Sequence, residues 1–234
     1  MTELINSRVV VPGLVFRSAA PYGLDAPQVH EVVDALGVRA VADLRGQRER
    51  VLAPWTGLEA TGAEYIDVAM DASADESALG LETAEDLGRL YLEWLDLKRE
   101  TVARALSPLA EGTPTLFHCA AGKDRTGMLA ALTGLLAGHS REQIIADYAL
   151  TAQNMPEVKA AMFEAYRPLV SEAQLAHLAE ANAPIIMSAP ENAMAVFLTG
   201  IDEEYGGVGG FLNSTRLHPA TASAIRENLE RAAG

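Results

Sequence analysis

The sequence predicts an α/β fold with a central, mostly parallel sheet flanked by helices. Short apolar runs alternate along the chain with longer amphipathic segments, which is the pattern of strands joined by helical crossovers. A glycine-containing loop separates the apolar run 114–117 from the helix-like run 128–137, and ligands bind at such strand ends in α/β sheets. No break in composition divides the 234 residues, so we expect a single domain over 1–234.

The N-terminal third is predicted to hold four strands and one helix. Pro12-Gly13 separates two β-branched apolar runs, which indicates a hairpin. Pro27 can open a helix that Gly37 ends. The expected elements are a hairpin over 9–16, a helix over 27–36, strands over 39–44 and 64–68, a charged loop over 45–50 and an acidic loop over 71–80.

The rest of the chain is predicted to be mainly helical. Apolar residues recur at helical spacing over 83–106, which indicates one or two helices, and Ser140 can cap a helix that follows it. We treat the helices within 151–200 as an insertion into the domain. The further expected elements are a strand over 115–118 and helices over 125–137, 141–148, 156–183, 191–198 and 219–232.

Composition narrows the classes of function. The formal net charge is −14 at pH 7, which argues against a nucleic-acid-binding protein and against broad docking on anionic membranes. One cysteine cannot form an internal disulfide or a cysteine-based zinc site. No signal-peptide pattern is visible and no apolar run reaches about 18 residues. We therefore expect no integral membrane association, and a protein that is cytoplasmic or secreted without a visible signal peptide.

One segment carries most of the chemical information, namely His118-Cys119-Ala120-Ala121-Gly122-Lys123-Asp124-Arg125-Thr126-Gly127. Small residues let a loop curl until successive backbone N–H groups face an anion, and the N-terminus of the following helix adds donors and partial positive charge. The same dipoles favour a thiolate at Cys119, the single cysteine. Arg125 offers a planar pair of donors for two phosphate oxygens. The segment therefore predicts a phosphate held over a nucleophile.

This segment resembles the phosphate-binding loop of the cysteine-dependent protein tyrosine phosphatase superfamily. Its Gly-Lys-Asp-Arg-Thr-Gly form is similar to a bacterial branch of tyrosine and phosphoinositide phosphatases, which includes a secreted mycobacterial member. Weaker similarities follow in the same order at 16–18, 41–45, 147–148 and 205–207. The resemblance implies a tyrosine-phosphatase-like fold in which the helices of 151–200 form a lid over the active site, and it implies neither a cofactor nor a metal.

The residues and the resemblance together assign roles within the loop. Cys119 is the expected nucleophile and Arg125 the expected phosphate clamp, while His118 is expected to orient the loop. In the resembled branch a lysine at position 123 accompanies activity on phosphoinositides as well as on phosphotyrosine. The expected phosphate-binding residues are Ala120, Ala121, Gly122, Lys123, Thr126 and Gly127.

The general acid is open between four aspartates in three segments of the chain. Many superfamily members supply it from a Trp-Pro-Asp segment, which this sequence lacks. Asp124 is favoured because it lies inside the loop, Asp43 at a predicted strand end is second, and the acidic-loop residues Asp71 and Asp75 are third. We hypothesise that Asp124 protonates the leaving oxygen.

Two arginines outside the loop are supporting candidates. Arg17 and Arg45 are expected either to contact the substrate or to hold loops in place by pairing with Glu49 or Asp43.

Three functions fit these residues. The leading one is a phosphatase that acts on phosphotyrosine proteins, and by extension on phosphoserine, phosphothreonine and phosphoinositides. The alternatives are a rhodanese-type sulfurtransferase and a phospho-ligand-binding module built on a phosphatase fold. The Arg-Thr-Gly ending disfavours the sulfurtransferase, and the presence of both Cys119 and Arg125 disfavours the binding module.

Overall fold

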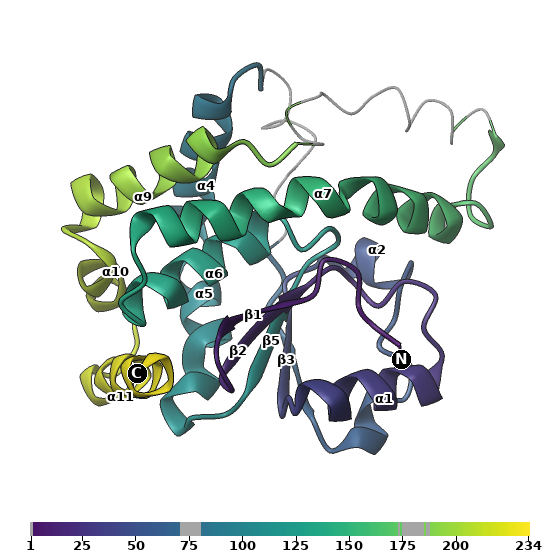
Figure 1. Cartoon of the computed structure of the whole chain (residues 1–234), viewed down its shortest axis with the longest axis horizontal. Coiled ribbons are helices and arrows are strands. Elements are labelled where there is room, and N and C mark those ends of the chain that lie inside the picture. Colours follow the sequence, from purple (N-terminus) through teal and green to yellow (C-terminus); the bar gives the residue numbers. More distant parts are fainter. Residues whose placement is uncertain (1, 71–80, 173, 175–184, 186–187) are drawn as a thin grey trace.

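The computed structural model describes residues 2–70, 81–172, 174, 185 and 188–234. Five strands form one mixed sheet in the order β1-β2-β5-β3-β4. β1 pairs antiparallel with β2, and the other three pairings are parallel, so the predicted α/β fold with a mostly parallel sheet is confirmed (Figure 1). The strands are β1 (Arg8–Val11), β2 (Val15–Ser18), β3 (Ala40–Asp43), β4 (Glu64–Asp67) and β5 (Thr115–His118).

The register of the parallel strands brings three loops to one edge of the sheet. His118, the last residue of β5, is level with Ser18 of β2 on one side and with Asp43 of β3 on the other. The strand-like pairing continues one step further, because the Leu44 N–H donates to the His118 carbonyl at 2.9 Å. The loop after β5 therefore leaves the centre of the sheet between the loops after β2 and β3.

Helices cover both faces of the sheet. On one face, α1 (Ala26–Leu36) and the 3-10 helix η1 (Leu58–Thr61) pack on apolar residues of β2, β3 and β5. On the other face lies α6 (Asp124–Leu136), and around it pack α4 (Ala84–Leu97), α5 (Arg99–Leu106), the 3-10 helix η2 (Ser107–Glu111) and α11 (Pro219–Ala233) (Figure 1). As predicted, α1 contains Pro27 in its first turn and ends at Gly37.

A single long helix replaces two predicted ones. α7 (Arg141–Tyr166) begins at the predicted cap, where Ser140 accepts a hydrogen bond from the Gln143 N–H, and it continues through Pro156. A proline inside a helix removes one backbone hydrogen bond and costs about 3 kcal/mol. Burial of the neighbouring Met155 and Val158 favours the helix at this point, and burial of such side chains contributes a similar amount. The expectation of a break before residue 156 was therefore wrong.

Other differences are local. The predicted charged loop 45–50 contains a short helix, α2 (Gln47–Arg50). After α7 come α9 (Glu191–Tyr205), which packs on α4, and α10 (Val208–Ser214). The acidic loop 71–80 and most of 173–187 lie outside the described residues. The lid over 151–200 thus remains a prediction; its described residues are 151–172, 174, 185 and 188–200, which include the C-terminal part of α7 and the N-terminal part of α9.

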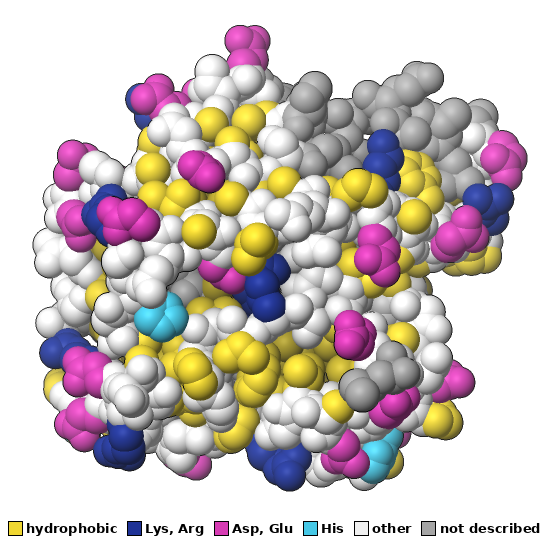
Figure 2. All heavy atoms as spheres, viewed as in Figure 1, with side chains coloured by type: hydrophobic (Ala, Val, Ile, Leu, Met, Phe, Trp, Pro, Cys, Tyr) yellow, Lys and Arg dark blue, Asp and Glu magenta, His cyan; other side chains and the backbone are white. Residues whose placement is uncertain are grey.

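The distribution of charged side chains on the surface agrees with the acidic composition of the chain. In Figure 2, Asp and Glu side chains are spread around this face, and the basic groups on it are scattered rather than joined into a patch. Among the described residues, no helix is long and apolar enough to cross a lipid bilayer.

Candidate active site

The predicted strand, loop and helix are present around Cys119. β5 ends at His118, Cys119 follows it directly, and α6 begins at Asp124. Cys119 is 2% exposed, so its thiol lies at the base of the loop rather than on the surface. The loop between β5 and α6, residues 119–123, lies at the N-terminus of α6, a helix of 13 residues. At this end the backbone N–H groups lack partners within the helix and favour an anion.

The carbonyl groups of 120–122 are held by hydrogen bonds from outside the loop. Their donors are the backbone N–H of Ala20 at 3.1 Å, the side-chain amide of Asn6 at 3.0 Å and the guanidinium of Arg17 at 2.7 Å. In a planar trans peptide the C=O and N–H groups point in opposite directions. The N–H groups of 121–123 therefore point away from these donors, toward the inside of the curve.

Gly122 allows this curve. Its backbone has a φ of +67°, a conformation that side chains with a Cβ rarely adopt. A Cβ on this residue would also lie 2.3 Å from the Ser18 carbonyl oxygen. The loop can pass this close to the end of β2 only with glycine at this position.

Arg125 is fixed by a carboxylate on α2. Its Nη1 and Nη2 donate to the two oxygens of Glu49 at 2.7 and 2.6 Å, and Nη1 also donates to the Leu44 carbonyl at 3.2 Å. Burial opposes the charge on Arg125, but the hydrogen bonds from Arg125 to Glu49 and the electrostatic influence of Cys119 and Glu49 outweigh burial and raise the Arg125 pKa. The guanidinium is thus oriented before any phosphate is bound.

Asp124 belongs to a chain of hydroxyl groups. Its carboxylate accepts a hydrogen bond from the Tyr91 hydroxyl, which in turn lies 2.7 Å from the Tyr148 hydroxyl. The Nζ of Lys123 lies 3.3 Å from the same carboxylate. The Asp124 side chain is 24% exposed, so it is accessible to the leaving group of a substrate.

The side chain of Lys123 lies in the interior of the protein. Lys123 was expected among the phosphate-binding residues; its side chain is fully buried, and its Nζ donates to the Ser188 carbonyl at 2.7 Å. The lysine thereby joins the phosphate loop to the segment that leads into α9. The sequence could not reveal this, because Ser188 is 65 residues away.

His118 is held as a neutral ring. Its Nε2 accepts a hydrogen bond from the Trp55 indole at 2.7 Å, so its proton is on Nδ1, which faces the Cys119 carbonyl at 3.3 Å. Burial lowers the His118 pKa to about 4, although the charge of Asp43 opposes this. The Nδ1 contact connects the ring to the Cys119 backbone, and the role of His118 in orienting the loop stays a prediction.

Asp43 and Arg45 form a buried pair. Two nitrogens of Arg45 donate to the Asp43 carboxylate at 2.9 and 2.7 Å, and the Tyr65 hydroxyl donates to it at 2.9 Å. Burial raises the Asp43 pKa, but the electrostatic influence of His118 and the bonds from Arg45 prevail and hold it well below its usual range. An ionised, fully buried carboxylate with these partners is poorly suited to donate a proton, so of the two described candidates the geometry favours Asp124.

Arg17 supports the loop from the side of β2. It pairs with Asp147 of α7 and donates to the Gly122 carbonyl. Its partner is therefore neither Glu49 nor Asp43, the two that the sequence suggested. Glu49 instead holds Arg125, whereas the expected pairing of Arg45 with Asp43 is present.

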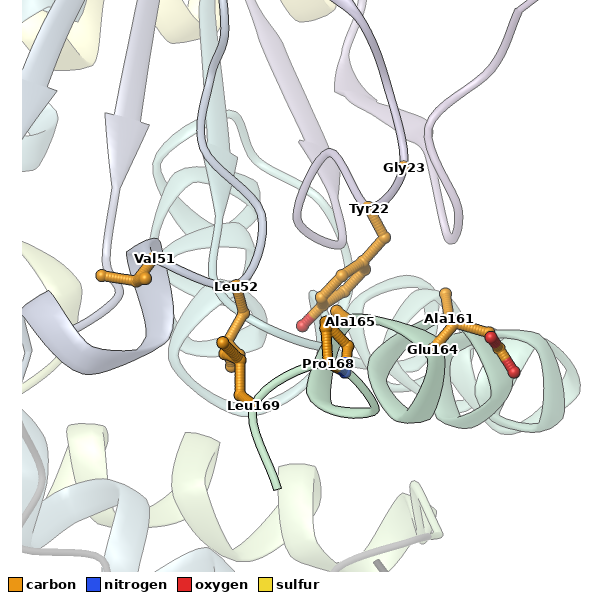
Figure 3. Close-up of a pocket in the computed structure, with 9 residues that line it drawn as sticks. All are labelled: Tyr22, Gly23, Val51, Leu52, Ala161, Glu164, Ala165, Pro168 and Leu169. Atoms are coloured by element: carbon orange, nitrogen blue, oxygen red, sulfur yellow. The ribbon is translucent and has the colours of Figure 1, made fainter. Parts of the chain in front are cut away.

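A cavity of about 400 Å³ lies among the segments that follow β2 and α2 and the C-terminal end of α7, and none of residues 119–125 lines it (Figure 3). Its walls are mainly apolar and come from the segment after β2, the segment after α2 and the end of α7. Figure 3 shows the Tyr22 ring extended between Leu52 and the end of α7. Burial raises the Tyr22 pKa, Arg45 opposes this, and the electrostatic influence of Cys119 and Glu49 raises it further. The lining residues are Tyr22, Gly23, Val51, Leu52, Ala161, Glu164, Ala165, Pro168 and Leu169.

The structure adds residues that sequence reasoning did not find. Asn6, Tyr22 and Tyr91 are each far from the loop in sequence, and no motif marks them. Thr126 was also predicted to bind phosphate. Its hydroxyl is buried and forms no hydrogen bond with any described residue.

The third-ranked candidates for the general acid, Asp71 and Asp75, lie outside the described residues. Among the residues that are described, no group of three or more His, Cys, Asp or Glu side chains is arranged to hold a metal ion.

Known proteins resemble this chain over most of its length. The chain is 29% identical to the triple specificity protein phosphatase PtpB of Mycobacterium tuberculosis, over 92% of this chain and 90% of that protein. It is 28% identical to a tyrosine-protein phosphatase of Nostoc commune, over 61% of this chain and 50% of that protein. The core catalytic domain of the PP-IP phosphatase SIW14 from S. cerevisiae aligns with a TM-score of 0.40 at 20% identity, over 77% of this chain and 94% of that one, a likeness too distant to carry an argument.

The family assignment rests on the whole chain rather than on the loop alone. The sequence pattern described as "Tyrosine phosphatase family" matches residues 2–231, which include the cysteine loop, the arginine and both flanks of the sheet. This match favours a phosphatase over a sulfurtransferase. The chain belongs to the tyrosine phosphatase family.

Proposed function

We propose that this protein hydrolyses phosphate monoesters of phosphotyrosine proteins, and with broader specificity those of phosphoserine, phosphothreonine and phosphoinositides. The observation that carries the proposal is the loop itself. A buried cysteine lies at its base, the N–H groups of 121–123 point inward, and Arg125 is fixed beside it by Glu49. Such donors stabilise the charge on phosphate oxygens during transfer, mostly through positioning and electrostatics.

In the first step the Cys119 thiolate attacks phosphorus. A P–S bond forms and the P–O bond to the substrate breaks, while Asp124 donates a proton to the leaving oxygen. In the second step a water oxygen attacks phosphorus, the P–S bond breaks, and the proton of the water passes to Asp124. The products are the free hydroxyl compound and inorganic phosphate, and the thiolate and the carboxylic acid are restored.

Arg125 suits both steps because its hydrogen bonds to the described residues use only its terminal nitrogens, and Nη1 donates to the Leu44 carbonyl as well as to Glu49. Glu49 occupies the Nη1 and Nη2 edge. The Nε and Nη2 edge matches two equatorial phosphate oxygens. Thr126, in the first turn of α6, supplies a buried hydroxyl close in sequence to the sulfur.

The cavity that Tyr22 lines supports one class of substrate, because Tyr22 interacts electrostatically with Cys119 and Glu49. Its apolar walls and the Tyr22 ring suit an aromatic ring attached to the phosphate, which supports phosphotyrosine as a substrate. The M. tuberculosis relative, a triple specificity protein phosphatase, supports broader specificity. The buried position of Lys123 offers no exposed cation for a phosphoinositide head group, so this part of the proposal rests on the relative alone.

A substrate panel tests the proposal. We expect the protein to release phosphate from a phosphotyrosine peptide, and Cys119→Ser to release none. A phosphoserine peptide and a phosphoinositide in the same panel define its breadth, with Lys123→Ala as the test of lipid activity. A parent protein that binds phosphopeptides without releasing phosphate would contradict the proposal and favour a binding module, whereas turnover of thiosulfate would favour a sulfurtransferase.

A further inference from the structure

Asn6 has an unusual backbone conformation for a residue with a side chain. It is the only non-glycine residue with a positive φ among those described, at +58°, and it is 5% exposed. Asparagine tolerates this left-handed conformation better than most residues. Asn6 lies in the short N-terminal segment that precedes β1, and it belongs to none of the motifs identified in the sequence.

The side-chain amide of Asn6 connects to two carbonyls of the phosphate loop. Its Nδ2 donates to the Ala121 carbonyl at 3.0 Å and to the Gly122 carbonyl at 3.2 Å. These carbonyls belong to the peptide units whose N–H groups face the inside of the loop. A donor placed here fixes the plane of those two peptides, and with it the direction of both N–H groups.

The other end of the amide fixes its orientation. The Asn6 Oδ1 accepts from Arg8 Nη1 at 2.6 Å and from Asn154 Nδ2 at 3.1 Å. Exchange of the oxygen and the nitrogen would set the oxygen against two carbonyls and the NH₂ group against two donors, so only one orientation satisfies all four contacts. Arg8 in turn pairs with Asp147 of α7.

We infer that Asn6 is a positioning residue for catalysis, which holds the N–H groups of 122 and 123 toward the phosphate. The inference rests on the proposed function, because it assigns a role in binding the same phosphate. It extends the site to a residue 113 positions before the nucleophile in sequence. Displacement of such donors by a fraction of an ångström weakens their interaction with the phosphate and with the transition state alike.

The decisive variant is Asn6→Gly. Glycine keeps the left-handed backbone and removes only the amide, whereas Asn6→Ala also introduces backbone strain. Asn6→Asp keeps the size of the side chain but replaces the NH₂ donor by an oxygen that faces two carbonyls. We expect all three to lower kcat for p-nitrophenyl phosphate by about 10- to 100-fold and to weaken inorganic phosphate binding by about 10-fold.

Asn228→Ala is the matched control. The Asn228 amide also donates to two neighbouring carbonyls, those of Leu109 and Ala110, both at 2.9 Å, but these lie in η2 away from the site. This variant removes the same chemistry and should leave kcat and phosphate affinity at the parent values. Melting temperatures of all variants separate a loss of folded protein from a loss of function in the folded fraction.

Two readouts keep the inference separate from the proposed function. Calorimetry with inorganic phosphate measures the loop without turnover, and p-nitrophenyl phosphate measures turnover. If the parent is active and folded Asn6→Gly has the same phosphate affinity and kcat as the parent, the inference about Asn6 is wrong. The proposed function is unaffected by that result. A parent that binds phosphate but does not turn over substrate would overturn the proposed function, while weaker phosphate binding by Asn6→Gly would still support the role of Asn6.

Discussion

Glu49 binds both terminal nitrogens of the Arg125 guanidinium, at 2.7 and 2.6 Å. The carboxylate lies on α2, in the loop region after β3, and the guanidinium lies in the first turn of α6. The pair therefore fixes the arginine relative to a second loop at the same edge of the sheet. A bidentate arrangement of this kind sets the plane of the guanidinium as well as its position.

Glu49→Gln is expected to lower kcat/KM for p-nitrophenyl phosphate by about 10- to 100-fold, because Arg125 loses the charge that orients it. Steady-state kinetics at pH 7 measure the effect. Glu64→Gln, which changes an exposed residue of β4, is the control and should match the parent. An unchanged kcat/KM in Glu49→Gln would show that the loop alone orients the arginine.

Gly122→Ala is expected to reduce phosphatase activity by at least about 100-fold, because the loop must move to relieve a contact of 2.3 Å with the Ser18 carbonyl. Gly62→Ala is the control. Gly62 has a similar φ of +75°, but its Cβ would meet no atom within 4 Å. Both variants carry the same backbone strain of about 1 kcal/mol, so a difference in activity between them measures the clash. Equal activities would contradict the close packing of the loop on β2.

His118 is expected to make folding stability depend on pH. Its pKa is about 4 in the folded protein, against an ordinary value of 6.5, because burial disfavours the charged ring. The unfolded chain therefore binds a proton that the folded protein does not, and the free energy of unfolding decreases as pH falls from 6.5 toward 4. The full loss over this window is about 3 kcal/mol.

Urea denaturation between pH 7 and pH 5 measures this slope, since the carboxylates with lowered pKa values lose their contribution only at lower pH. His118→Gln should flatten the slope, and His30→Gln, at an exposed position on α1, should not. A His118 ring that titrates near 6.5 by NMR would refute the prediction.

The sequence predicted the parts of this site that are local in the chain. The strand, the loop and the helix around Cys119 follow from residues within one continuous segment, and a loop of small residues has few ways to connect them. The caps of α1 and α7 were also readable, because Gly37 and Ser140 act on their own neighbours.

The partners of the loop could not be predicted in the same way. The tertiary structure brings three distant residues into contact with the loop and the start of α6, namely Asn6, Glu49 and Tyr91. The residues next to them in the sequence do not indicate these contacts. The register of β2, β3 and β5 decides which side chains meet. For the same reason the sequence did not indicate that Lys123 is buried or that its Nζ donates to the Ser188 carbonyl.

Asp124→Asn tests the proton donor. The loss of kcat should be about 100-fold or more for a poor leaving group such as an alkyl phosphate, because the leaving oxygen then departs without a proton. For p-nitrophenyl phosphate, whose leaving group is stable as an anion, the loss should be much smaller. Pre-steady-state measurements of both substrates isolate the first step. Equal losses for the two substrates would exclude Asp124 as the acid and show that its main role is to hold the Tyr91 hydroxyl.

Tyr22→Ala tests whether the cavity that Tyr22 lines selects aromatic phosphates. The ring and its apolar neighbours provide a surface for the ring of phosphotyrosine, and an aromatic pair contributes about 0.5–1.5 kcal/mol beyond the area that it buries. We expect the KM for a phosphotyrosine peptide to rise by about 10-fold, and the KM for a phosphoserine peptide of the same sequence to change by less than about 2-fold. Val9→Ala, at an exposed apolar residue of β1, controls for the loss of surface apolar area. Equal effects on the two peptides would mean that Tyr22 shapes the loop instead of contacting the substrate ring, because only a direct contact with the ring distinguishes an aryl from an alkyl ester.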